Sequence, residues 1–246
     1  MTPGEIVLVG AVFFCAAFTK GVTGLGFASI ALPLLALALG LKTAMPLVIV
    51  PSLTSNLLVM RDAGGFGAMA RRFWPLYLSA LPGVLIGLWC LTWVSSIGAG
   101  AVLGSVLFVY GAFMVSRPPL ALAPDLERPL APIIGLTTGT LNGLTGSQVM
   151  PILPYLMALP LTPNQLIQTI NTSFTLSSLL FAAGLATIGL MTPQLALLSV
   201  AGLVPVFLGI KAGGLIRARL QPEAFRRLIL VFLMAMGLAL ILKAFV

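Results

Sequence analysis

Residues 18–29 of the chain read FTKGVTGLGFAS, and residues 139–154 read GTLNGLTGSQVMPILP. Both stretches interrupt apolar runs with glycines and small polar residues. GVTG at 21–24 matches GLTG at 143–146, while the only charge in either stretch is Lys20. A chain that breaks its apolar segments twice in the same way is organised around these two breaks.

The composition is that of a membrane protein. The chain is 59% hydrophobic and 7% charged, with a mean hydropathy of +1.15, whereas soluble domains carry roughly 25% charged residues. Backbone groups in lipid are satisfied only within helices or closed barrels. Barrel strands alternate apolar and polar residues, and the run LILVFLMAMGLALILKAFV at 228–246 does not. The sequence therefore predicts an all-α polytopic membrane protein.

Charges and Gly/Pro clusters divide the chain into ten apolar segments, five on each side of a polar linker, RPPLALAPDLERP. We expect a first membrane repeat at 1–116, a cytoplasmic linker at 117–129 and a second repeat at 130–246, joined in one transmembrane domain. The expected segments are 4–19, 26–41, 43–60, 73–93 and 97–116, then 130–142, 147–160, 163–188, 192–214 and 223–245.

The first two segments of each half are shorter than the roughly 20 residues that a straight span needs. We expect each such pair to form a hairpin of two short spans or a re-entrant pair of half-helices.

The basic residues predict that the two halves are inverted. In the first half the third connection, 61–72, is basic and the next turn, 94–98, is uncharged. In the second half the corresponding turn, 187–193, is uncharged, and the next region, 211–227, is basic. Because positive loops face the cytoplasm, equivalent loops lie on opposite sides. Inverted repeats are typical of secondary transporters.

This pattern also predicts a topology in the cell inner membrane. Both termini are expected outside, and loops 61–72, 117–129 and 215–227 are expected to be cytoplasmic. The net charge of +8 is assigned to these loops and to lipid headgroups, so the bilayer is an expected partner and nucleic acid is not. A homo-oligomer is compatible with this topology.

The glycine-rich breaks and two polar helix faces are the candidate site. Glycines let backbone N–H groups approach a ligand closely, and the helix that follows presents a positive dipole end. We therefore expect a small anionic substrate. The expected binding residues are Lys20, Gly21, Thr23, Gly24, Gly26, Ser52, Asn142, Gly143, Thr145, Gly146, Ser147, Gln148, Asn171, Thr172 and Thr175.

Each part of this candidate site also has a purely structural interpretation. The glycines could serve only close helix packing. Gln168, Asn171, Thr175 and Ser178 share one helical face, which either lines a pathway or hydrogen-bonds to other helices. Segment 43–60 offers Ser52, Thr54, Ser55 and Asn56 at the corresponding place.

The sequence lacks the residues that several kinds of chemistry require. The chain has no histidine, and its five acidic residues lie near segment ends or in loops, whereas proton relays use such groups within the membrane. Neither a nucleotide-binding glycine loop, nor a metal-ligand cluster, nor a nucleophile–base pair is evident. We expect no enzyme activity, no cofactor and no metal. An anion leaving an inside-negative cell gains about 2.3 kcal/mol per charge per 100 mV, which favours export.

The chain resembles the TauE/SafE family of sulfite and organosulfonate exporters. The resemblance rests on residues 20–40 and 139–178, with glycine-rich motifs followed by Pro33 and Pro154, and with Thr172-Ser173 in the next helix. It implies export of a small sulfur-containing anion, such as sulfite or sulfoacetate, across a bacterial inner membrane. Ion-coupled uptake of an organic acid or sulfur compound, and a membrane scaffold subunit, are the alternatives.

Overall fold

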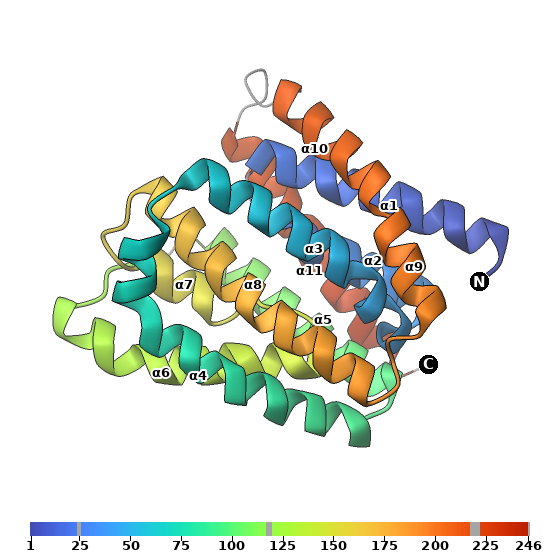
Figure 1. The fold of residues 1–246 in the computed structure, drawn as a ribbon, viewed down its shortest axis with the longest axis horizontal. Coiled ribbons are helices and arrows are strands. Elements are labelled where there is room, and N and C mark those ends of the chain that lie inside the picture. The colour runs from blue at the N-terminus through green and yellow to red at the C-terminus, as the bar shows by residue number, and fades with distance from the viewer. Residues whose placement is uncertain (24–25, 117–119, 217–221, 246) are drawn as a thin grey trace.

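The computed structural model describes residues 1–23, 26–116, 120–216 and 222–245, without the side chains of 222–224 and 226. Within these ranges the chain is helices joined by short connections (Figure 1). The helices are α1 Pro3–Thr23, α2 Phe27–Leu39, α3 Leu41–Ala63, α4 Phe66–Trp93, α5 Ser96–Val115, α6 Pro124–Thr145, α7 Ile152–Met157, α8 Pro163–Thr187, α9 Pro193–Ala201, α10 Leu203–Ile216 and α11 Pro222–Leu242.

Six helical stretches in the described ranges are long and apolar enough to cross a membrane: α1, α3, α4, α5, α8 and the α9–α10 pair. Large apolar side chains cover the outside of the bundle. On α4, for example, Trp74, Leu78, Trp89 and Trp93 are all more than half exposed. Such a surface is stable only in lipid. The chain is a multi-pass helical membrane protein, as its composition predicts.

The expectation that the first two segments of each half are short is wrong for the first of each pair. Helix α1 has 21 residues and α6 has 22, whereas α2 has 13 and α7 has 6. Helix α1 continues through Gly21 because the bundle packs around that glycine. Helix α6 begins inside the expected linker, because Pro124 suits a first helical turn and acidic residues complement the dipole there.

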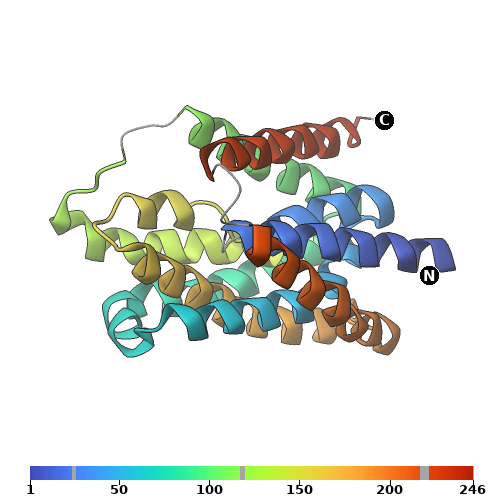
Figure 2. The same ribbon diagram turned by 90° about the horizontal axis from the view of Figure 1, so that it is seen from above.

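Each pair returns to the end of the bundle from which it enters. The Tyr155 hydroxyl of α7 donates to the Glu127 carbonyl near the start of α6 at 2.7 Å. At the opposite end, Lys243 Nζ near the C-terminus donates to the Leu37 carbonyl of α2 at 2.8 Å. Both termini lie at that second end, and α6 enters from the first (Figures 1 and 2). The two hairpins therefore enter from opposite ends.

The loop 61–72 and the described part of the linker 117–129 share one end of the bundle (Figure 2). A salt bridge joins them there, with Arg72 Nε 2.6 Å and Nη2 2.7 Å from the two carboxylate oxygens of Glu127. Residues 217–221 of the expected loop 215–227 lie outside the described residues.

Helices of the two halves pack in pairs along glycine-lined seams. Helix α1 lies along α10, α4 along α6 and α5 along α11, while α3 lies beside α8. Gly139 of α6 faces the Ala80 carbonyl, and Gly213 of α10 faces the Phe18 carbonyl. Gly237 of α11 faces the Gly104 carbonyl. Small residues allow this close approach of backbones, which drives helix association in lipid.

Helix α3 carries two prolines and is held in place by a serine of α9. Pro51 has no N–H, so the Leu47 carbonyl loses its helical partner. Ser199 Oγ donates to that carbonyl at 2.8 Å and accepts from Val50 N at 3.3 Å. This pair of hydrogen bonds stabilises α3 next to Ser52, where the candidate site begins.

Candidate functional site

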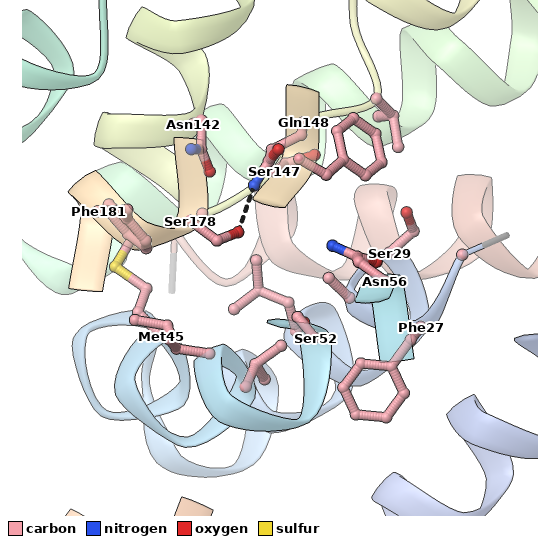
Figure 3. Close-up of a pocket in the computed structure, with 18 of the residues that line it drawn as sticks. Phe27, Ser29, Met45, Ser52, Asn56, Asn142, Ser147, Gln148, Ser178 and Phe181 are labelled. Carbon is pink, nitrogen blue, oxygen red and sulfur yellow. Dashed lines mark hydrogen bonds between the residues drawn. The ribbon is translucent and has the colours of Figure 1, made fainter. Parts of the chain in front are cut away.

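The tips of the two hairpins meet α3 and α8 around a central cavity of about 50 Å³ (Figure 3). Figure 3 shows Ser29, Ser52 and Asn56 on one side of this cavity and residues of the second half on the other. The second-half side chains that it labels there are Asn142, Ser147, Gln148, Ser178 and Phe181. Each half of the chain thus contributes one wall.

Lys20 is the one basic residue among the described residues that line this cavity. Its side chain is 4% exposed, and its Nζ donates to Asn56 Oδ1 at 2.7 Å and to Ser55 Oγ at 3.0 Å. Ser55 Oγ in turn donates to the Ser52 carbonyl at 2.9 Å. No carboxylate of the described side chains pairs with Lys20. A buried ammonium group without a counter-ion is costly, and a bound anion is one group that would offset this cost.

Four polar residues of the cavity lining have buried hydrogen-bonding atoms without a partner. Within the described part of the chain, both amide atoms of Asn142 lack a partner, as do Ser52 Oγ, Ser147 Oγ and Gln148 Oε1. All four residues line the cavity. Leaving such a group unpaired costs about 1–3 kcal/mol, and buried polar groups in folded proteins normally have a partner. A bound polar ligand would supply the missing hydrogen bonds.

The start of α2 adds backbone donors. Gly26 precedes the helix with φ 95°, a conformation that favours glycine, and it has no side chain with which to cap the helix. The N–H groups of Phe27, Ala28 and Ser29 therefore have no partner within the helix, and all three residues line the cavity. The positive end of the α2 dipole reinforces the charge of Lys20.

The end of α6 positions the opposite wall. Helix α6 ends at Thr145, and the next residue, Gly146, has φ 75° and donates its N–H to the Asn142 carbonyl at 2.7 Å. Thr145 Oγ1 donates to the Leu141 carbonyl at 2.6 Å and accepts from Ser147 N at 3.2 Å. The connection after α6 is therefore fixed, and Gln148 Nε2 donates to Ser178 Oγ of α8 at 3.0 Å.

About half of the residues expected from the sequence line the cavity. Those residues are Lys20, Gly26, Ser52, Asn142, Gly146, Ser147, Gln148 and Asn171. Thr145, Thr172 and Thr175 instead donate to carbonyls of their own helices. Thr23 lines a neighbouring apolar cavity, and Gly24 lies outside the described residues.

Gly21 and Gly143 pack against other helices, away from the cavity lining. Gly21 faces the Ile210 carbonyl of α10, and Gly143 faces the Val84 carbonyl of α4. For these two glycines the structure therefore favours the close-packing interpretation.

The expected set left out three polar residues that line the cavity: Ser29, Asn56 and Ser178. The sequence does place Ser178 on the polar face that contains Asn171, and Asn56 among the polar residues of segment 43–60. It leaves open whether these residues line a pathway or bond to other helices. The apolar part of the lining, which includes Phe27, Phe174 and Phe181, has no such signal, because an aromatic residue in an apolar helix is unremarkable by pattern alone.

Comparison with known proteins adds one finding. No curated protein and no solved structure matches the chain. A family model described as "Sulfite exporter TauE/SafE" matches residues 9–240, which is nearly the whole chain. The chain belongs to the TauE/SafE sulfite exporter family.

Proposed function

We propose that the protein is a secondary transporter that carries a small sulfur oxyanion, sulfite or a small organosulfonate, outward across the cell inner membrane. The observation that carries this proposal is the lining of the central cavity. It contains buried Lys20, which has no paired carboxylate among the described side chains, and amide and hydroxyl groups that have no partner there. Charge-assisted hydrogen bonds from such donors are those that an oxyanion accepts best.

The size of the cavity supports a small substrate. A site needs roughly 10–15 Å³ of such volume to hold one water, so about 50 Å³ accommodates about four water-sized groups. Sulfite has four non-hydrogen atoms. A larger sulfonate needs additional space beyond this cavity.

The packing supports two inverted repeats, α1–α5 and α6–α11. In this comparison α1 corresponds to α6, α3 to α8, α4 to α9–α10 and α5 to α11. Exchanging the two halves then turns the α1–α10 pair into the α6–α4 pair, and it leaves the α3–α8 and α5–α11 pairs unchanged. In the proposed orientation both termini face outside, and loops 61–72, 117–129 and 215–227 face the cytoplasm. The hairpin tips then approach the site from opposite sides, an arrangement compatible with alternating access around a fixed site.

Outward transport follows from the energetics. The five acidic residues lie near segment ends or in loops, so a carboxylate that could carry a coupled proton is lacking at membrane depth. An anion leaving an inside-negative cell needs no coupling, because it gains about 2.3 kcal/mol per charge per 100 mV.

Flux measurements in proteoliposomes test this proposal. Vesicles loaded with labelled sulfite or sulfoacetate should release it faster when an imposed potential makes the interior negative, with no requirement for sodium or a pH gradient. Release that ignores the potential, or that depends on sodium or protons, would contradict uncoupled export. The second of these results would favour ion-coupled transport.

A further inference from the structure

A second, larger cavity adjoins the central one. It has a volume of about 380 Å³ and lies among α1, α2, α5, α7, α8 and α11. Its wall is mainly aliphatic, with contributions from Leu153, Met157, Leu166, Ile170, Leu230 and Leu233. None of its described lining residues is charged. The hydroxyls of Thr19 and Thr23 donate to carbonyls of their own helix.

The two cavities share part of their lining. Gly26, Ser29, Val149 and Phe174 contribute to both, so a molecule in the central cavity has the apolar cavity directly beside it. An apolar cavity of about 150 Å³ is enough to bind benzene. The apolar cavity here therefore has room for an aromatic ring or a chain of several carbons.

We propose that this apolar cavity receives the hydrocarbon part of an organic anion whose acidic head occupies the central cavity. This inference rests on the proposed function for the head and adds the class of substrate, an amphiphilic sulfonate with an alkyl or aryl group. A bare sulfite ion passing along this wall would lose hydration without new hydrogen bonds, which is costly. A hydrocarbon tail instead gains from leaving water.

Binding of a chain-length series to the full-length protein in lipid nanodiscs tests the proposal. The probes are sulfite, methanesulfonate, butanesulfonate and hexanesulfonate. We expect binding to tighten by about fourfold for each added CH₂. Hexyltrimethylammonium, which has the same chain and the opposite charge, should not compete with hexanesulfonate.

Filling the apolar cavity provides the second arm. Leu230→Trp enlarges a side chain that is 6% exposed and lines this cavity. It should remove the gain with chain length while leaving sulfite binding within about twofold of wild type. Leu228→Trp on the same helix is the matched control, because Leu228 is 64% exposed, and it should keep the chain-length gain.

Each contrary result identifies what fails. If sulfite binds but chain length has no effect, the tail site is wrong and the proposed function stands. A chain-length gain that survives Leu230→Trp would show partition into lipid, and a copurified phospholipid that no sulfonate displaces would show a lipid site. Either would overturn the inference.

If none of the anions binds, the proposed function fails as well. If Leu230→Trp does not fold, the chain-length series on the wild-type protein and the hexyltrimethylammonium control still test whether the apolar cavity binds the tail.

Discussion

Lys20 and Asn142 divide the work of the site between the two halves of the chain. Lys20 holds a charge between Ser55 and Asn56, whereas Asn142 presents an amide that is fully buried and unpaired within the described residues. A positive charge attracts an anion from any direction, and an amide donor requires a defined position. In the proposed function, the first residue therefore attracts anions in general, and the second helps to select among them.

Replacing Asn142 should separate stability from binding. In Asn142→Leu, two unpaired polar atoms disappear, so the free energy of unfolding should rise by about 1 kcal/mol or more. Sulfite binding should weaken at least tenfold, because a donor to the anion is lost. Thermal unfolding with and without sulfite measures both effects.

Thr138→Val is the matched control for Asn142→Leu. Thr138 lies on the same helix, and its buried hydroxyl is also unpaired within the described residues, but it does not line the cavity. This variant should gain stability and bind sulfite as wild type does. If Asn142→Leu binds sulfite normally, Asn142 has no role in recognition.

At the scale of helices, glycines pack the first helix of each hairpin closely against a helix of the other half. Helix α6 presents Gly135, Gly139 and Gly143 to α4, and α1 presents Gly21 to α10. Because these contacts join backbone to backbone, an added methyl group meets a carbonyl that cannot move without shifting its whole helix.

Gly143→Ala should therefore act through packing. We expect it to lower the free energy of unfolding by about 1–3 kcal/mol, while sulfite affinity in the folded fraction stays within about threefold of wild type. Gly10→Ala on α1 is the control, since nothing lies within 4 Å of the added methyl group. If Gly143→Ala is as stable as wild type but does not bind sulfite, Gly143 belongs to the binding site and the packing role is contradicted.

Ser199→Ala tests how α3 is supported. The change removes the donor to the Leu47 carbonyl and the acceptor for Val50 N, so we expect a loss of about 1–3 kcal/mol of unfolding free energy. Ser177→Ala is a suitable comparison, since Ser177 is a buried serine of α8 outside the cavity lining. Equal stability of Ser199→Ala and wild type in thermal unfolding would contradict this role.

The sequence predicts those features that depend on neighbouring residues, and it does not predict those that depend on which distant helices pack together. Composition and apolar runs predicted the helical membrane class, and the paired glycine motifs predicted that Lys20, Asn142 and Gln148 share a site. The same motifs could not separate Gly26, which lines the cavity, from Gly143, which packs on α4. That distinction depends on which helix lies opposite, and the pairing of α4 with α6 leaves no local pattern.

At the scale of the whole molecule, the ends of the bundle differ in charge. Among the described residues, the end with loop 61–72 carries four basic side chains, those of Arg61, Arg71, Arg72 and Arg128, whereas the other end carries two, those of Lys42 and Lys243. With the positive-inside rule, this asymmetry supports a cytoplasmic position for the basic end.

Single cysteines should report this orientation. In a background with Cys15 and Cys90 replaced, a cysteine at Asp62 should react with an impermeant reagent only from the cytoplasmic side. A cysteine at Ser95 should react only from the outside. The reverse pattern would invert the proposed topology, and equal labelling of both positions from one side would contradict a single span for α4.

The most direct test of the central claim is sulfite binding by Lys20→Met compared with Lys211→Met. Lys20 is buried in the cavity wall, whereas Lys211 is exposed on α10. A hydrogen bond from a charged group is worth about 1.5–3 kcal/mol, so we predict that Lys20→Met binds sulfite at least tenfold more weakly than wild type. Lys211→Met should bind as wild type does. Equal affinity of Lys20→Met and wild type, in folded protein, would contradict anion recognition at this site.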